Sequence, residues 1–464
     1  MKDHHIFFLG GTGIRVAQAL VFACAHGLLS DTRLHLTVLD TDHEEQAIKK
    51  LEKTITLYQK LHIRWDMLRK DRIKQKHPGA QFPLFGAKIA DFRCLPSFLQ
   101  NTSSGPSTLR NVLLERNLPR AAYAVLHGTF GDHFFYQVID NGLYANPAVG
   151  AYLLRDKMVD NSPPNGFRVA VDQPDQNEKV ALCASSFGGT GVAAAEVMLK
   201  EFSAEEERHG EWYKNKMQVS TFLVQPYFTI KPRAGSNDYW DADEANRRHA
   251  EVKRHYERRG DIRMKFIEPA HKGKWMRGVY KDHEQENLPD ITEWMAAIEI
   301  AAWLYDNNEN ETWRLRAEMM QARELFYELS VIWTKRFEPA QKYGPMFFSA
   351  FYRRCKGCTN RCWFQEGCRE NLKDFLNEYY KWHRVSQTED YTDASDLFVV
   401  CKNAHGIDMM DLYDVKLVKE KDEFSFEDKQ FEHGKKLWRL AASKGYDGME
   451  DLFSGLYYDL GRMT

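Results

Sequence analysis

The sequence predicts an α/β protein in which helices connect the strands of a mainly parallel sheet. Short apolar segments alternate with longer segments of helical spacing between residues 6 and 305, as expected when parallel strands are joined through helices. Two of the expected strands run into glycine-rich turns, at Gly10 and at Gly188. A third strand ends in acidic residues, at Asp40. These observations favour a sheet whose carboxyl edge carries the ligand.

The first expected unit is a strand, a glycine turn, a helix and a second strand. The apolar segment 6–9 leads into the loop Gly10, Gly11, Thr12 and Gly13, and residues 14–29 have apolar side chains at helical spacing. The next strand, 34–39, ends in Asp40, Thr41 and Asp42. The following region, 43–130, reads as helical and irregular, with a basic, solvated helical face over 49–76.

The second glycine turn has the same organisation. Residues 180–184 form an apolar run, and residues 192–202 are expected to be a helix. Between them lie Gly188, Gly189, Thr190 and Gly191. Glycine allows the backbone to turn sharply and to approach a ligand closely. Because a helix start also offers unpaired N–H groups and a positive dipole end, this arrangement predicts an anion site, most often for phosphate.

Further elements continue the alternation. Residues 219–228 are expected to be a strand closed by proline, 244–259 a charged helix and 263–269 a short strand. The first glycine loop taken alone leaves three interpretations open. It could bind the pyrophosphate of a dinucleotide with Asp40 on a ribose, although the third small position of that fingerprint is Val16. It could bind a mononucleotide, or be an ordinary strand-to-helix turn.

The overall composition excludes several classes of protein. The 464 residues suffice for two or three domains, and 43% are hydrophobic, so a substantial core is expected. A net charge of −2 gives no support for nucleic-acid binding. Neither a secretory signal nor an apolar run long enough for a membrane span is recognisable, which predicts a cytoplasmic protein.

Five segments, in this order, resemble the loops of the tubulin/FtsZ superfamily of GTP-binding proteins. They are Gly10–Gly13, Asp40–Asp42, Gly142–Gly150, Phe187–Gly191 and Val224–Phe228. The likeness covers roughly residues 5 to 305 and is nearest to the divergent prokaryotic tubulin-like group. It implies a Rossmann-like sheet of the tubulin/FtsZ GTPase type, a central helix over 290–305, and a setting in a bacterial defence or conflict system.

The resemblance also implies roles for individual residues. The loops at Gly10 and Gly188 would cradle the phosphates of GTP or GDP, and Asp40 or Asp42 would hold Mg²⁺. The third loop would close over the terminal phosphate with Tyr144, Ala145 and Asn146. Asn287 and Asp290, at the start of the central helix, are candidates to read guanine, although either could equally be a helix cap.

The sequence departs from the family pattern in three loops, and the third loop of the pattern is shorter here. Phe187 stands where the fourth loop would have a further glycine, and Val192 and Ala193 replace a hydroxyl-bearing residue and a glycine. After the central helix, Glu309 and Glu311 are the candidate catalytic carboxylates of a GTPase, but the family's catalytic spacing is not recognisable there. Whether the protein is an enzyme therefore stays open.

Four cysteines are clustered in the last third of the chain, at Cys355, Cys358, Cys362 and Cys368. A Cys-x2-Cys pair followed by two further thiols can bind Zn²⁺ with tetrahedral geometry. An iron–sulfur cluster uses the same ligands, and cysteines without metal are the third alternative. The sequence therefore favours, without requiring, a structural metal in this segment.

The expected organisation is a nucleotide-binding region over 1–285, a central helix and loop over 286–311, and a divergent α+β module over 312–464. The expected function is GTP binding that controls self-association or the binding of a protein partner. A scaffold subunit that retains its nucleotide without hydrolysis is the first alternative. A dinucleotide-dependent enzyme is the second.

Overall fold

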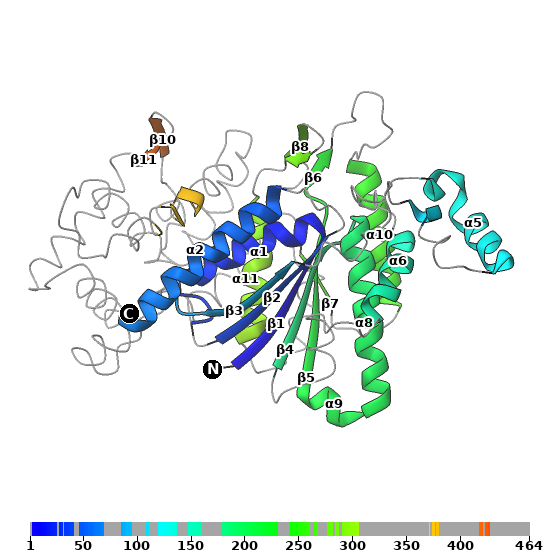
Figure 1. Cartoon of the computed structure of the whole chain (residues 1–464), viewed down its shortest axis with the longest axis horizontal. Helices are drawn as coiled ribbons and strands as arrows, with labels where there is room; N and C mark the ends of the chain where they lie inside the picture. Colours follow the sequence, from blue (N-terminus) through cyan, green and yellow to red (C-terminus); the bar gives the residue numbers. More distant parts are fainter. Residues whose placement is uncertain are drawn as a thin grey trace, which may run out of the picture.

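Six parallel strands form the central sheet in the computed structural model (Figure 1). They are β1 (Lys2–Leu9), β2 (Thr32–Leu39), β3 (Lys88–Cys94), β4 (Glu178–Ser185), β5 (Met217–Val224) and β7 (Met264–Ile267). Their order is β3-β2-β1-β4-β5-β7, and all five pairings are parallel. The expectation of an α/β fold with a mainly parallel sheet is confirmed.

The structure describes only part of the chain. The described residues are 2–25, 27–30, 32–40, 46–68, 85–94, 108–111, 119–136, 147–159, 178–230, 242–258, 264–267, 276–281, 284–286, 290–305, 371, 374–375, 377–379, 417–420 and 423–426.

Helices cover both faces of the sheet. On one face lie α1 (Gly10–Ala25), α2 (Gln46–Leu68) and α11 (Ile291–Tyr305), with α1 in contact with both of the others. On the other lie α6 (Pro147–Val159), α8 (Gly189–His209) and α10 (Ala242–Glu257), whose apolar side chains share one core with those of β1, β4 and β5. The connections β1-α1-β2 and β4-α8-β5 thus lie on opposite faces, and the sheet has its switch point between β1 and β4.

The register aligns the carboxyl ends of the central strands. Leu9 pairs with Leu39 on one side and with Ala184 on the other, and Ala184 pairs with Leu223. Gly10, Asp40 and Ser185 are the next residues along their strands. Because parallel neighbours keep the same direction, the loops that follow β1, β2 and β4 all begin at one edge of the sheet.

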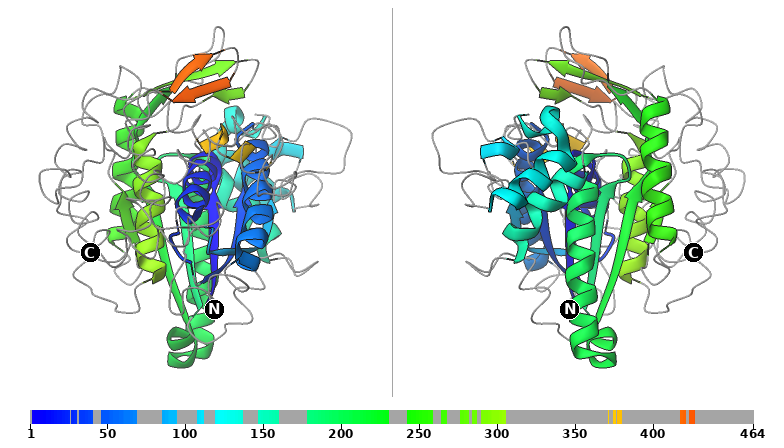
Figure 2. Two further views of the ribbon diagram at one scale, coloured as in Figure 1. Left: turned by 90° about the vertical axis from the view of Figure 1, so that its left-hand side faces the viewer. Right: turned by 90° about the vertical axis from the view of Figure 1, so that its right-hand side faces the viewer.

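Smaller elements complete the described part of the chain. They are α5 (Arg120–Phe135), α9 (Glu211–Lys216), a sheet of β6 (Phe228–Ile230), β8 (Met276–Lys281) and β9 (Glu284–Glu286), and the hairpin β10 (Leu417–Glu420) and β11 (Glu423–Phe426). Figure 2 shows the small green sheet beyond the carboxyl ends of the long strands, opposite the label N. Within the described residues, no helix combines the length and apolarity needed to cross a bilayer.

The expected strand over 219–228 is two strands. β5 ends at Val224, and β6 begins at Phe228 in the separate small sheet. Between them lies Pro226, which has no N–H to donate to a strand ladder. The basic segment of α2 is also more than a solvated face, since Leu51, Tyr58 and Trp65 are buried.

A short segment late in the chain packs against α1 and α2. Phe375 is buried, with its ring centroid 5.7 Å from Phe22 of α1, 6.4 Å from Tyr58 of α2 and 5.4 Å from Phe85. Tyr379 makes an edge contact with Phe22, at 5.4 Å between ring centroids. Residues from the last third of the chain therefore contribute to this core.

Candidate functional site

The two glycine loops meet at the switch point of the sheet. Gly10, the first residue after β1, is in the left-handed region, with φ +73°, and a Cβ built on it would lie 3.2 Å from the Gly191 nitrogen and 3.8 Å from the Thr190 Cβ. The loop after β1 and the loop after β4 are therefore in direct contact. Residues separated by about 180 positions in the sequence thus pack against each other.

Close packing requires glycine at two further positions. A Cβ at Gly13 would lie 2.8 Å from the Phe8 carbonyl carbon and 2.9 Å from the Cys183 oxygen. A Cβ at Gly191 would lie 2.7 Å from the Leu9 oxygen. These distances are shorter than van der Waals contact, so a side chain at either position would force a helix away from the sheet. Glycine at Gly13 and Gly191 is thus explained by packing, whatever binds there.

Both loops continue directly into helices. α1 begins at Gly10 and α8 at Gly189, and the N-cap of α8 is Gly188, which has no side chain to cap the first turn. The first four N–H groups of an α-helix have no acceptor within the helix. Two such sets of donors, each at a positive dipole end, lie at the same edge of the sheet and favour an anion.

Hydrogen bonds to residues of β4, β5 and α10 hold the loop after β4 in place. Ser185 Oγ accepts a hydrogen bond from the Gly188 N–H at 3.1 Å. Ser186 donates to the Val224 carbonyl through its N–H, at 2.8 Å, and through its hydroxyl, at 3.1 Å. His249 Nδ1 lies 2.8 Å from Ser186 Oγ; since that hydroxyl already donates, His249 is the donor. Burial, followed by the charge of Lys253, lowers the pKa of His249 to about 4.

The side chain of Phe187 has a packing role that a glycine at this position could not fill. The Phe187 side chain is buried, and its ring meets the ring of Phe228 edge-on, with centroids 5.4 Å apart. Phe228 begins β6, so Phe187 joins the loop to the small sheet. Val192 and Ala193, at the start of α8, are buried as well.

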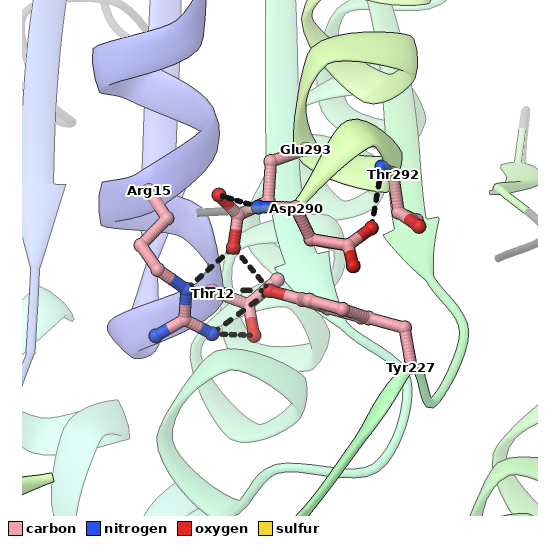
Figure 3. Close-up of polar contacts among 6 residues, drawn as sticks. All are labelled: Thr12, Arg15, Tyr227, Asp290, Thr292 and Glu293. Atoms are coloured by element: carbon pink, nitrogen blue, oxygen red, sulfur yellow. Dashed lines mark hydrogen bonds and ion pairs between the residues drawn. The ribbon is translucent and has the colours of Figure 1, made fainter. Parts of the chain in front are cut away.

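A buried polar cluster lies beneath the first loop (Figure 3). Arg15 of α1 is 8% exposed, and its Nε donates to Glu293 Oε1 at 2.7 Å. Its Nη2 donates to the Tyr227 hydroxyl at 2.9 Å and to Thr12 Oγ1 at 3.2 Å. The Tyr227 hydroxyl in turn donates to Glu293 Oε1 at 2.7 Å. Side chains from α1, α11 and the segment after β5 are thus joined to a residue of the first loop.

The start of α11 is a capping box. Asp290 Oδ1 accepts from the Thr292 N–H at 2.7 Å, and Glu293 Oε2 accepts from the Asp290 N–H at 3.2 Å. The two side chains satisfy backbone donors at the end of the helix reciprocally. Of the two roles open to Asp290, the structure therefore shows the helix cap. Glu293, the other residue of the capping box, is also bound to Arg15.

Burial dominates the ionisation of this cluster. It raises the pKa of the Glu293 carboxyl above its ordinary value, and the neighbouring Arg15 charge opposes that shift. It also raises the pKa of Tyr227 well above 10, with the Arg15 charge again opposing. The phenol therefore keeps its proton at neutral pH and remains a donor to Glu293.

Apart from Asp290, which caps α11, the predicted site residues divide into two groups. The structure places the two glycine loops, Thr12, Thr190 and Asp40 at one edge of the sheet; Thr12, Thr190 and Asp40 are 5%, 8% and 6% exposed. The other candidates lie outside the described residues: Asp42, Tyr144, Ala145, Asn146, Asn287, Glu309, Glu311, Cys355, Cys358, Cys362 and Cys368. In the described part of the chain, no three His, Cys, Asp or Glu side chains gather in a group that could hold a metal ion.

Sequence reasoning missed Arg15, Tyr227, Glu293 and His249. Two signals could have pointed to them. A charged residue interrupts the apolar, glycine-rich start of α1 at Arg15, and Asp290 and Glu293 have the spacing of a capping box. Neither signal says which residues would be partners.

Comparison with protein-family models, with curated proteins and with solved structures finds no match to this chain.

Proposed function

We propose that this chain binds a nucleoside triphosphate where the loops after β1 and β4 meet. The contact between Gly10 and Gly191 carries the proposal, because it brings the starts of two helices together at the switch point of a parallel sheet. Ligands of open α/β sheets bind at this position. Backbone N–H groups of both loops would bind the phosphates, and the hydroxyls of Thr12 and Thr190 would donate to phosphate oxygens.

Asp40 suits a place beside Mg²⁺ in this site. It immediately follows Leu39, which pairs with Leu9, so it stands next to the first loop at the carboxyl edge. A buried carboxylate provides the hard oxygen ligand that Mg²⁺ requires. When bound, Mg²⁺ would neutralise part of the phosphate charge, and Asp40 would hold it directly or through water.

Our finer proposal is a GTP-binding protein of the tubulin/FtsZ type. It is supported by the order of the five loop segments and by α11. This helix follows the last strand of the central sheet in the chain and packs against α1. The nucleotide state would then control self-association or the binding of a protein partner, in a setting such as bacterial defence. Glu309 and Glu311 lie outside the described residues, and no hydrolytic step forms part of the proposal.

A dinucleotide is the second candidate ligand, and one observation favours it. Asp40 follows the strand next to β1, which is where dinucleotide-binding folds carry the acidic residue that binds a ribose hydroxyl. Against it, the third small position of the fingerprint is Val16, whose side chain is fully buried.

The ligand released from the purified full-length chain on heating separates these candidates. We expect a guanine nucleotide by chromatography and mass spectrometry, with Mg²⁺ required for retention, and zinc in the protein by metal analysis if the cysteine segment binds it. NAD in the supernatant would support the dinucleotide alternative. Supernatant free of nucleotide, together with no binding of added GTP, would contradict the proposal.

The Thr12 hydroxyl provides a test at the level of one atom. We expect Thr12→Val to weaken the binding of a fluorescent GTP analogue by about 10- to 100-fold, because a hydrogen bond to a charged group contributes about 1.5–3 kcal/mol. Thr129→Val is the matched control, since its hydroxyl bonds the Val125 carbonyl within the exposed helix α5. Equal affinity of the Thr12 variant and the wild type would exclude this hydroxyl from the site.

A further inference from the structure

The direction of each hydrogen bond in the Arg15 cluster can be assigned. A guanidinium has only donors and an ionised carboxylate only acceptors. Arg15 therefore donates to Glu293, Tyr227 and Thr12. The phenol has a single proton, and that proton is directed at Glu293 Oε1, 2.7 Å away. Every bond within the cluster is thereby fixed, and at its end the Thr12 hydroxyl is an acceptor (Figure 3).

This assignment leaves the proton of Thr12 to be donated elsewhere. A threonine hydroxyl has one proton and two lone pairs, and Arg15 Nη2 occupies a lone pair. Among the described residues, the structure shows no acceptor for that proton. Thr12 is nonetheless 95% buried, being 5% exposed, and it lies in the first turn of α1 at the carboxyl edge of the sheet. A phosphate oxygen, which only accepts, is the complementary group.

Arg15 itself is poorly suited to bind the phosphate directly. Its Nε and Nη2 are occupied by Glu293, Tyr227 and Thr12, and its charge is offset by a carboxylate 2.7 Å away. Its guanidinium carbon also lies 5.2 Å from the centre of the Phe228 ring, which restricts its movement. Through its bond to Thr12, Arg15 can instead fix the orientation of the Thr12 hydroxyl.

We propose that Arg15 is a positioning residue that holds the Thr12 hydroxyl as a donor toward bound phosphate, while Tyr227 and Glu293 fix the guanidinium. This inference rests on the proposed nucleotide site and assigns a role within it. Glu293 also belongs to the capping box of α11. The start of α11 and the donor direction at Thr12 therefore depend on the same carboxylate.

The test uses the full chain with two probes, GTP and guanosine. Arg15→Lys keeps a cation beside Glu293 but lacks the second nitrogen that reaches Thr12. We expect it to weaken GTP binding by about three- to tenfold, since the hydroxyl can then rotate among its staggered positions. Guanosine has no phosphate, so its affinity should not change. A purely structural role for Arg15 would weaken both ligands equally.

A double-mutant cycle separates the effect of Arg15 on Thr12 from any general loss of folding or of ligand affinity. In a Thr12→Val background, Arg15→Lys should have no further effect on GTP binding, because the group it positions is gone. If Arg15→Lys does not fold, the paired variant Arg15→Gln/Glu293→Gln, which buries no unpaired charge, replaces it in the same cycle. If the losses of GTP affinity in the two variants add up in the double variant, the role of Arg15 is overturned while the proposed function stands. Failure of the wild-type chain to bind GTP would overturn the proposed function and the inference with it.

Discussion

His4 is a buried histidine in β1 whose surroundings favour the neutral ring. Its Nδ1 accepts a hydrogen bond from the Lys179 N–H at 3.3 Å, and its side chain is 0% exposed. Burial, followed by the positive charge of Lys179, lowers its pKa from 6.5 to about 4. The unfolded chain therefore binds a proton at His4 at a higher pH than the folded chain does.

This difference predicts a loss of stability in mild acid. A group with a lowered pKa in the folded state contributes stability above its unfolded pKa, and this contribution is lost as the pH falls from about 6.5 to about 4. Between pH 7 and pH 5, His4 should account for about 2 kcal/mol of the decrease in unfolding free energy. Urea unfolding at both pH values measures it. In the His4→Leu variant, the decrease in unfolding free energy between pH 7 and pH 5 should be smaller by that amount. If the variant and the wild type show the same pH dependence, His4 is not the group responsible.

At the scale of single residues, the sequence predicted the loops better than their surroundings. Glycine, threonine and aspartate at strand ends indicate a ligand edge by local rules, and these residues do meet at one edge. The ion pair of Arg15 and Glu293 spans 278 positions. No local rule connects such residues, because their contact depends on how α11 packs against α1.

The contact of α8 with β1 depends on the absence of a side chain at Gly191. A Cβ there would lie 2.7 Å from the Leu9 oxygen and 3.1 Å from the Ala184 Cβ. We expect Gly191→Ala to destabilise the fold by about 1–3 kcal/mol, the usual cost of overpacking. The loss of unfolding free energy in urea measures this effect. A loss of ligand in this variant would therefore not by itself identify a phosphate contact.

Gly128 provides the matched control for that substitution. It lies within α5, and a Cβ built on it would meet no atom within 4 Å. Alanine is favoured over glycine in a helix, so Gly128→Ala should raise the unfolding free energy by about 0.5–1 kcal/mol. Similar effects of the two substitutions would show that the close approach of α8 and β1 is not maintained in solution.

Among the elements, the apolar strands were predictable and the edge strand was not. The parts of β1 and β4 over 6–9 and 180–184 are continuous apolar runs, because both faces of the sheet are covered by helices there. β3 contains Lys88, Asp91 and Arg93, and Ile89 is its one buried residue. Its position is set by pairing with β2, including a contact of 2.8 Å between His35 Nδ1 and Asp91 Oδ1. That partnership cannot be read from the β3 segment alone.

At the scale of the whole molecule, Phe375 connects the last third of the chain to the sheet domain. Its ring is 0% exposed among Phe22, Tyr58 and Phe85. We expect Phe375→Ala to lower the unfolding free energy by about 3–5 kcal/mol, as for other buried phenylalanines. Urea unfolding followed by tryptophan fluorescence measures the change, and limited proteolysis reports whether the late segment detaches first.

Lys53→Ala is the control on the same surface. Its ion pair with Glu378, at 2.8 Å, joins the same two parts of the chain, but the Lys53 side chain is 56% exposed. Exposed ion pairs contribute about 0–1 kcal/mol. If Phe375→Ala costs no more than Lys53→Ala, the late segment does not unfold together with the sheet.

The helix α11 is attached near both of its ends by buried charged side chains. Near its start, Glu293 is bound to Arg15 at 2.7 Å, and near its end, the Lys179 ammonium donates to the Trp303 carbonyl at 2.7 Å. These two attachments are separated by about 15 Å along the axis, at about 1.5 Å per residue. Sliding the helix lengthwise would break both together, so α11 behaves as a strut. The helix thereby links Arg15, near the carboxyl edge of the sheet, to Lys179, near its amino edge.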